Sequence, residues 1–143
     1  MQLHLKKSLF HIQLLQMQKL LIIQKKMMTG EVKVENNVVT FADGNKITLP
    51  ENVLQLLKGH EGSMTLGIRG EDIKTEDRYL EQYRENIQHA VITDTEVMGN
   101  EDNLYFQFGG TQAVARVSKY EVAQVGDTID FVFMPEKLHF FDK

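Results

Sequence analysis

A short charged run, Arg69-Gly70-Glu71-Asp72, brings one guanidinium group and two carboxylates close together in the chain. Such a cluster can form ion pairs across an interface between two copies of the protein. It can equally be a solvated turn, whose exposed ion pairs contribute about 0–1 kcal/mol each. General acid–base catalysis would need acids and bases that converge in a pocket, and their spacing in this sequence predicts no such pocket. A Gly-x-Ser-x-Gly or Ser/His/Asp arrangement is also absent, so we do not expect an independent enzyme.

The histidines form no metal-binding pattern. His60, His89 and His139 are scattered along the chain, whereas His4 and His11 would share a face only if the first residues form a helix. Cysteine is absent, which excludes disulfides, a cysteine nucleophile and cysteine-based zinc sites. We therefore expect this chain to bind no metal or cofactor and to function in the reducing environment of the cytoplasm.

Charge is distributed unevenly along the chain. Residues 1–28 carry five lysines and no acid, which leaves 11 basic and 20 acidic groups, a net charge of −9, on residues 29–143. This negative charge on residues 29–143 repels the phosphate backbone of nucleic acids. Attraction to that backbone supplies most of the non-specific affinity of proteins for nucleic acids. Tyr105, Phe106 and Phe108 could stack on bases as in OB folds, but strand alternation puts Phe106 and Phe108 on one face, as in a barrel core. We expect no nucleic-acid partner.

Residues 1–28 are rich in Gln, Lys, Leu, Ile and Met and lack Gly, Pro, Asp and Glu. Their apolar residues recur at helical spacing but spread almost all round a helix, so such a helix would need a partner. Three interpretations remain open: a docking or coiled-coil helix, a basic membrane-surface helix, and translated sequence unrelated to the fold, such as a frameshift would produce. The longest apolar run, residues 20–23, is far shorter than the roughly 20 residues of a membrane span. We expect a soluble protein without a transmembrane helix or a signal peptide.

The elements that must position the polar side chains are predominantly short β-strands. A turn at Asn36-Asn37 separates the alternating residues 31–35 from a return strand at residues 38–41, which is the pattern of a β-hairpin. Asp43-Gly44 supplies a second turn, because this pair tolerates the positive φ angles of a tight reversal. Further strands are predicted at residues 46–49, 64–68, 87–97, 104–108, 113–117 and 128–133.

One short helix is predicted at residues 51–58, which follow Pro50 and begin with an acid. Charges crowd residues 71–86, where we expect at most a turn of helix. Many short strands at close spacing are typical of a small barrel or sandwich rather than of βαβ units. The sequence thus predicts an all-β domain over residues 29–143, preceded by the atypical residues 1–28.

Four stretches resemble, in order and spacing, the ATP-binding subunits of carbohydrate importers of the maltose and multiple-sugar type. Leu-Gly-Ile-Arg-Gly-Glu-Asp-Ile at residues 66–73 is similar to that family's Leu-Gly-Ile-Arg-Pro-Glu-Asp/His-Ile signature. Thr-Glu-Val-Met-Gly-Asn-Glu at residues 95–101 is similar to Val-Glu-x-Leu-Gly-x-Glu, and Ala-Arg-Val follows at residues 115–117. Pro-Glu-Lys-Leu-His-Phe-Phe-Asp at residues 135–142 is similar to the family's closing Pro-Glu-Lys-x-His-x-Phe-Asp. The resemblance covers residues 28–143 and none of the family's ATPase domain.

The resemblance implies the C-terminal, OB-like regulatory barrel of such a subunit, often called the TOBE region. In that family two ATP-binding subunits dimerise, couple ATP hydrolysis to membrane permease subunits at the inner face of the cell membrane, and receive signals from cytoplasmic regulatory proteins through this domain. ATP and Mg would belong to the parent protein only, because this sequence lacks the Gly-x-x-x-x-Gly-Lys-Ser/Thr loop that cradles phosphates. The family-motif or interface candidates are Leu66, Gly67, Ile68, Arg69, Glu71, Asp72, Gly99, Glu101, Arg116, Pro135, Glu136 and Lys137.

Two other functions remain open. A standalone module could bind a sugar or an oxyanion between barrels, since related TOBE domains in other transporters bind oxyanions, although no basic cluster here favours an oxyanion. A structural module could dimerise through a helix formed by residues 1–28.

Gly70 departs from the family pattern, which has proline at this place. Proline fixes φ and reduces the conformational freedom of the unfolded chain. We therefore expect the substitution Gly70→Pro to stabilise the domain by about 1 kcal/mol.

Overall fold

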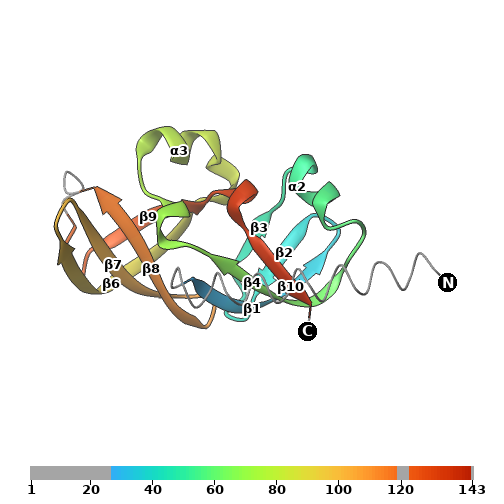
Figure 1. Cartoon of the computed structure of the whole chain (residues 1–143), viewed down its shortest axis with the longest axis horizontal. Coiled ribbons are helices and arrows are strands. Elements are labelled where there is room, and N and C mark those ends of the chain that lie inside the picture. Colours follow the sequence, from blue (N-terminus) through green and yellow to red (C-terminus); the bar gives the residue numbers. More distant parts are fainter. Residues whose placement is uncertain (1–26, 119–122, 143) are drawn as a thin grey trace.

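The computed structural model describes residues 27–118 and 123–142, whose strands form two five-stranded antiparallel sheets (Figure 1). The first sheet has the strand order β10-β4-β1-β2-β3 and the second the order β5-β9-β6-β7-β8. The strands are β1 (Met28–Glu35), β2 (Val38–Phe41), β3 (Lys46–Thr48), β4 (Gly62–Ile68), β5 (Ile73–Lys74), β6 (Gln88–Met98), β7 (Glu101–Phe108), β8 (Thr111–Ser118), β9 (Thr128–Phe133) and β10 (His139–Asp142). The helix suggested for the first residues, with His4 and His11, lies outside the described residues.

The first sheet is built around the predicted hairpin. β1 and β2 pair with Val34 opposite Val39, and Asn36 in the turn between them adopts φ 54°, a left-handed conformation that asparagine tolerates better than most residues. Along β1, Val32 and Val34 are buried whereas Lys33 is exposed, which is the alternation expected of a strand with one face on the core. β4 pairs with the other edge of β1, so β1 lies in the middle of the sheet.

The second sheet is a meander of β6, β7 and β8, with β9 on the other edge of β6. Phe106 and Phe108 on β7 are 0% and 2% exposed, which confirms their predicted place in the core. Tyr105 lies between them on the outer face, where its hydroxyl donates to Glu96 Oε1 at 3.1 Å. The two sheets curve into a nearly closed barrel, so the prediction of an all-β barrel is confirmed.

An aromatic cluster fills the barrel interior. The ring of Phe131, which is 0% exposed, has its centroid 4.9 Å from that of Phe106, 5.3 Å from Phe108 and 5.5 Å from Phe133. Phe41 from the first sheet joins them, with its centroid 4.9 Å from that of Phe108. The tilted and edge-on packing of these rings is the arrangement that aromatic pairs prefer, so the two sheets share one core.

The described residues contain two α-helices, α2 (Glu51–Leu56) and α3 (Asp77–Gln82), and three 3-10 turns, η1 (Gly70–Asp72), η2 (Arg84–Asn86) and η3 (Pro135–Lys137). The predicted helix at residues 51–58 is confirmed, with Leu57 as its C-cap. The second helix lies in the charged segment where we predicted only a helical turn. Over residues 27–118 and 123–142, no helix has both the length and the apolar character to cross a membrane.

Side chains join the two sheets at one edge of the barrel. The Asn86 amide accepts from the Thr48 backbone N–H and donates to the Thr48 carbonyl, both at 2.8 Å. Gln88, a buried polar residue, donates from Nε2 to the Lys46 carbonyl at 3.0 Å. Together these amides hold β3 of the first sheet against the chain that leads into β6 of the second.

Gly70 lies against the backbone of β8, and this contact changes our expectation for the Gly70→Pro substitution. A Cβ atom at Gly70 would lie 2.8 Å from the Val114 carbonyl oxygen and 3.4 Å from the Arg116 backbone nitrogen. Because these are backbone atoms of a strand, they cannot move aside as a flexible side chain does. The prediction that Gly70→Pro stabilises the domain is therefore wrong for this structure.

Candidate functional site

Two of the motif stretches, far apart in the sequence, meet in the structure. β4 runs directly into η1, and η3 runs into β10, which pairs with β4 so that His139 lies opposite Gly67. The backbone N–H of Met134 donates to the Asp72 carbonyl at 3.0 Å and ties the two turns together. We call the charged side chains around this contact the motif junction; they are Arg69, Glu71, Asp72, Lys74, Lys137 and His139.

Several of the predicted motif residues are structural. Leu66 and Ile68 are 0% exposed and Pro135 is buried, so these three side chains pack inside the domain and present nothing to a partner. Gly67 is also buried, and a Cβ there would lie 3.1 Å from Met27 Sδ and 3.2 Å from the Phe141 ring. These residues therefore position the junction and do not themselves form a contact surface.

The charged residues of the junction are partly exposed and close to one another. Arg69 Nη1 lies 3.8 Å from Glu71 Oε1, with the Arg69 side chain 27% exposed. Its Nε atom is buried and has no hydrogen-bond partner within the described part of the chain. Burial, and then the nearby Glu71 carboxylate, raise the pKa of Asp72 above its usual value, although Lys137, Lys74 and Arg69 oppose the shift. The cluster therefore mixes both signs of charge within a partly desolvated surface.

The remaining candidates lie at different distances from this cluster. Arg116 is exposed on β8, whose backbone packs against Gly70, so it flanks the junction. Gly99 and Glu101 belong instead to the tip of the β6–β7 hairpin, at the end of the molecule opposite α2 (Figure 1). The structure thus gathers the first and last motif stretches but not the second.

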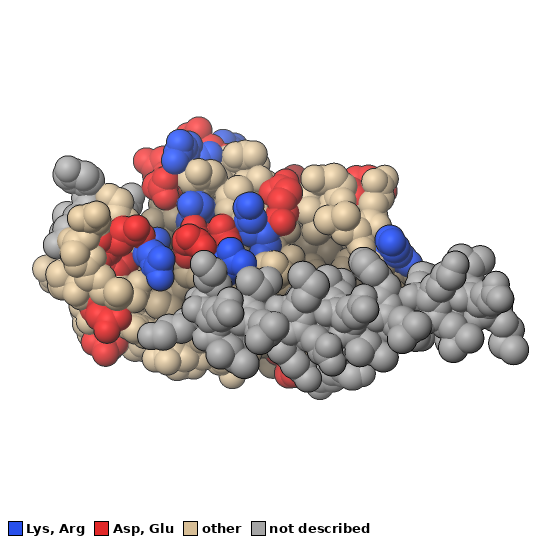
Figure 2. Space-filling view, viewed as in Figure 1, with Lys and Arg blue, Asp and Glu red and all other residues tan. Residues whose placement is uncertain are grey.

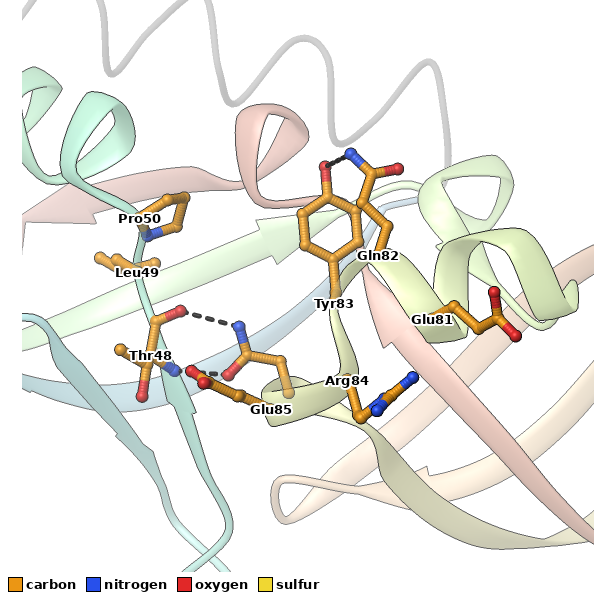
Figure 3. A pocket seen from close by; sticks show the side chains of 9 residues that line it. Thr48, Leu49, Pro50, Glu81, Gln82, Tyr83, Arg84 and Glu85 are labelled. Atoms are coloured by element: carbon orange, nitrogen blue, oxygen red, sulfur yellow. Dashed lines mark hydrogen bonds between the residues drawn. The ribbon is translucent and has the colours of Figure 1, made fainter.

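A cleft next to the junction is not apparent from the sequence. We call it the α3 cleft; its walls are Thr48, Leu49 and Pro50 on one side and residues 81–86 on the other, and its volume is about 460 Å³ (Figure 3). The Tyr83 hydroxyl lies 3.5 Å from Glu136 Oε2, to which it donates, and accepts from Gln82 Nε2 at 3.2 Å. The motif residue Glu136 therefore connects the junction to the wall of this cleft. Tyr83 and Glu136 are far apart in the sequence, so only the structure shows that they are in contact.

No cluster of three or more His, Cys, Asp or Glu side chains suited to a metal ion occurs among residues 27–118 and 123–142. His89 hydrogen-bonds to Asp130 across the β6–β9 pair, His60 follows α2 and His139 begins β10. These three histidines thus belong to separate elements, each with its own surroundings.

His139 should make the stability of the domain fall on mild acidification. Burial, and then the positive charge of Arg69, lower the pKa of its imidazole, while Asp72 opposes the shift. The unfolded chain therefore binds a proton first as the pH falls through about 6.5, so stability is highest above that pH and is lost towards the folded-state pKa. Urea unfolding at about pH 7.5 and pH 5.5 should show a smaller loss for His139→Gln than for the wild type. His60→Gln is the control, and equal losses in all three proteins would contradict this assignment.

Comparison with known proteins agrees with the motifs. A model of the TOBE domain family matches residues 66–141, more than half of the chain. The multiple sugar-binding transport ATP-binding protein MsmK of Streptococcus mutans is 30% identical over 115 residues, covering 78% of this chain and 30% of that protein. The oligosaccharides import ATP-binding protein MsmX of Bacillus subtilis is 34% identical over 99 residues, covering 67% of this chain and 27% of that protein. The chain thus spans about 30% of the length of the relatives it matches.

A solved structure shares the fold. The cytoplasmic molybdate-binding protein ModG, in a molybdate-bound form, superposes with a TM-score of 0.62 over 81% of this chain and 96% of its own, at 14% sequence identity. At this identity the likeness concerns the fold alone. The family match and the curated relatives confirm the relationship that the motifs predicted: this chain belongs to the TOBE domain family.

Proposed function

We propose that this chain is the regulatory and self-association domain of the ATP-binding subunit of a carbohydrate importer. The observation that carries the proposal is the convergence of two motif stretches, both inside the region matched by the TOBE family, on one mixed-charge surface. MsmK and MsmX, named as ATP-binding proteins of sugar transport, support the sugar-import setting. The chemistry of the chain is association and not catalysis.

The motif junction suits contact between two copies of the chain. In a twofold dimer the same patch meets itself, so a patch that carries both signs of charge can be self-complementary. Figure 2 shows basic and acidic residues alternating across the face that carries the junction. Arg69 of one copy would then face Glu71 of the other, and its partly buried side chain would lose less freedom on binding than a fully exposed one.

The remaining roles belong to the proposed parent protein. ATP and Mg would bind its nucleotide-binding domain, and that domain would contact the permease subunits at the inner face of the cell membrane. Cytoplasmic regulatory proteins would act through the domain described here. ATP binding and sugar transport are supported by the names of the relatives, and the other roles are those that the resemblance of the motifs implies.

Reversing the charge of Arg69 should weaken the dimer. In Arg69→Glu a carboxylate at position 69 of one copy would face Glu71 of the other, so we expect the dimer dissociation constant to rise at least tenfold, about 1.4 kcal/mol. Sedimentation equilibrium over a concentration series measures this change. Lys33→Glu, the same charge reversal at an exposed residue of β1, is the control and should leave the dissociation constant unchanged.

A compensating variant makes this test specific. Arg69→Glu combined with Glu71→Arg restores both charges in exchanged positions and should recover most of the affinity. A wild-type chain that stays monomeric throughout the concentration series would overturn self-association, and the regulatory role would then have to depend on other partners.

A further inference from the structure

The α3 cleft has the size and the position of a ligand site. Its volume of about 460 Å³ falls in the range of roughly 300–1,000 Å³ found for small-molecule sites. It lies between the end of β3, which belongs to the first sheet, and the chain leaving α3, which leads into the second. In Figure 3 Tyr83 and Gln82 lie on one side of the opening and Leu49 and Pro50 on the other.

Hydrogen bonds fix the distance between the two sides of the cleft. The Asn86 amide accepts from the Thr48 backbone N–H and donates to the Thr48 carbonyl, so it sets the width of the cleft at this end. The Tyr83 hydroxyl accepts from Gln82 and donates to Glu136, which holds the outer end of the ring in place. A ring held in this way loses little freedom when a ligand stacks on it, so the site is preorganised.

The lining combines a flat apolar surface with hydrogen-bonding groups. The ring of Tyr83 on one side and Pro50 on the other are half-buried and provide the apolar contact, whereas Leu49 is buried beneath them in the core. Around them lie exposed side chains that donate and accept hydrogen bonds; these are Thr48, Glu81, Gln82, Arg84 and Glu85. Two carboxylates against one guanidinium, with Glu136 beyond Tyr83, make the lining acidic.

This chemistry selects among ligand classes. Oxyanions and phosphate esters are repelled by the excess of carboxylates and meet only one guanidinium. A sugar ring has a face of C–H groups that packs on an aromatic ring and a rim of hydroxyls that both donate and accept. We propose that the α3 cleft binds the end of a neutral oligosaccharide, with one sugar ring stacked on Tyr83 and its hydroxyls bonded to Gln82 and Glu85.

The proposal goes beyond self-association and does not depend on it. Sugar in the cleft would contact both β3 and the chain leaving α3, and through the Tyr83–Glu136 hydrogen bond it would reach η3. The site would thereby link a neutral carbohydrate to the motif junction.

Titration of the full 143-residue chain with maltotriose and raffinose, followed by two-dimensional ¹H–¹⁵N NMR, tests the proposal. We expect saturable shifts of the amide signals of Thr48, Leu49, Glu51 and residues 82–86, with a dissociation constant in the millimolar range or below. Sodium molybdate, sn-glycerol 3-phosphate and spermidine serve as anionic and cationic comparisons and should leave these signals in place.

Variants of two tyrosines make the result specific to the cleft. Tyr83→Ala should weaken sugar binding at least tenfold, whereas Tyr83→Phe, which keeps the ring, should retain most of it. Tyr105→Ala removes a tyrosine from the outer face of β7 and should bind as the wild type does. If Tyr83→Ala loses its folded spectrum, Gln82→Ala, at an exposed residue, replaces it with the same expectation.

The outcomes that overturn the proposal are distinct from failure of the association model. No saturable shifts with either sugar at tens of millimolar, shifts confined to other residues, or a response to the anions or to spermidine alone would each reject a neutral-sugar site. Binding is read directly from the chain, so any of these results leaves the dimer measurements untouched.

Discussion

Phe131→Ala should destabilise the domain by about 3–5 kcal/mol, the range measured when a fully buried aromatic side chain is truncated. Phe131 is 0% exposed and its ring packs on those of Phe106, Phe108 and Phe133. Truncation would remove all three ring contacts and leave a cavity at the centre of the core. Since small domains have only about 5–15 kcal/mol of stability, the midpoint of urea unfolding should fall steeply.

Tyr105→Ala is the matched control for this loss. Its ring lies on the outer face of the same sheet, so truncation should cost only a fraction of the Phe131→Ala effect. Similar losses for the two variants would show that the barrel interior is not the main source of stability.

Gly70→Pro should lower the stability of the domain by about 1–3 kcal/mol, the usual cost of forcing atoms into a packed site. The new Cβ would meet the Val114 carbonyl oxygen at 2.8 Å, so β8 would have to move away from η1. The entropy that proline removes from the unfolded chain offsets only about 0.4–1 kcal/mol of this cost. Urea unfolding of Gly70→Pro and Gly70→Ala should show losses in both variants.

Gly30→Ala provides the control for adding a Cβ atom. A Cβ at Gly30 would meet its nearest neighbour, Thr111 Cγ2, at 3.5 Å, which is an ordinary contact, so this variant should keep or slightly raise the stability. A higher midpoint for Gly70→Pro than for the wild type would refute the close approach of β8 and η1 and restore the expectation drawn from the sequence.

Elements with strong local signals could be predicted from the sequence. The hairpin of β1 and β2 was evident because Asn36-Asn37 separates two runs of alternating residues. β9 matches the predicted strand at residues 128–133, and α2 begins directly after Pro50 as expected. In each case the pattern and the turn residues lie within a few positions of one another.

Elements stabilised by distant partners could not be predicted in this way. β5 has two residues and exists because it pairs with β9, and β10 is defined by its pairing with β4. The approach of β8 to Gly70 likewise depends on the closure of the barrel, which the family pattern of proline at that position did not reveal. Periodicity within a short window contains none of this information.

The candidate site was predicted in part. The charged residues Arg69, Glu71 and Lys137 were identified from their motifs, and the structure places them around one contact. Tyr83 and Asn86 were missed, because their roles rest on hydrogen bonds to residues far away in the sequence, Glu136 and Thr48.

The side-chain amide of Asn86 also covers part of the edge of the first sheet. β3 is an edge strand, and an uncovered edge is a template on which another chain can add a strand and start aggregation. The Asn86 side chain bonds both the N–H and the carbonyl of Thr48, and the Gln88 side chain bonds the carbonyl of Lys46. Side-chain amides therefore cap part of this edge, which leaves fewer free backbone groups at β3 for the addition of a strand from another chain.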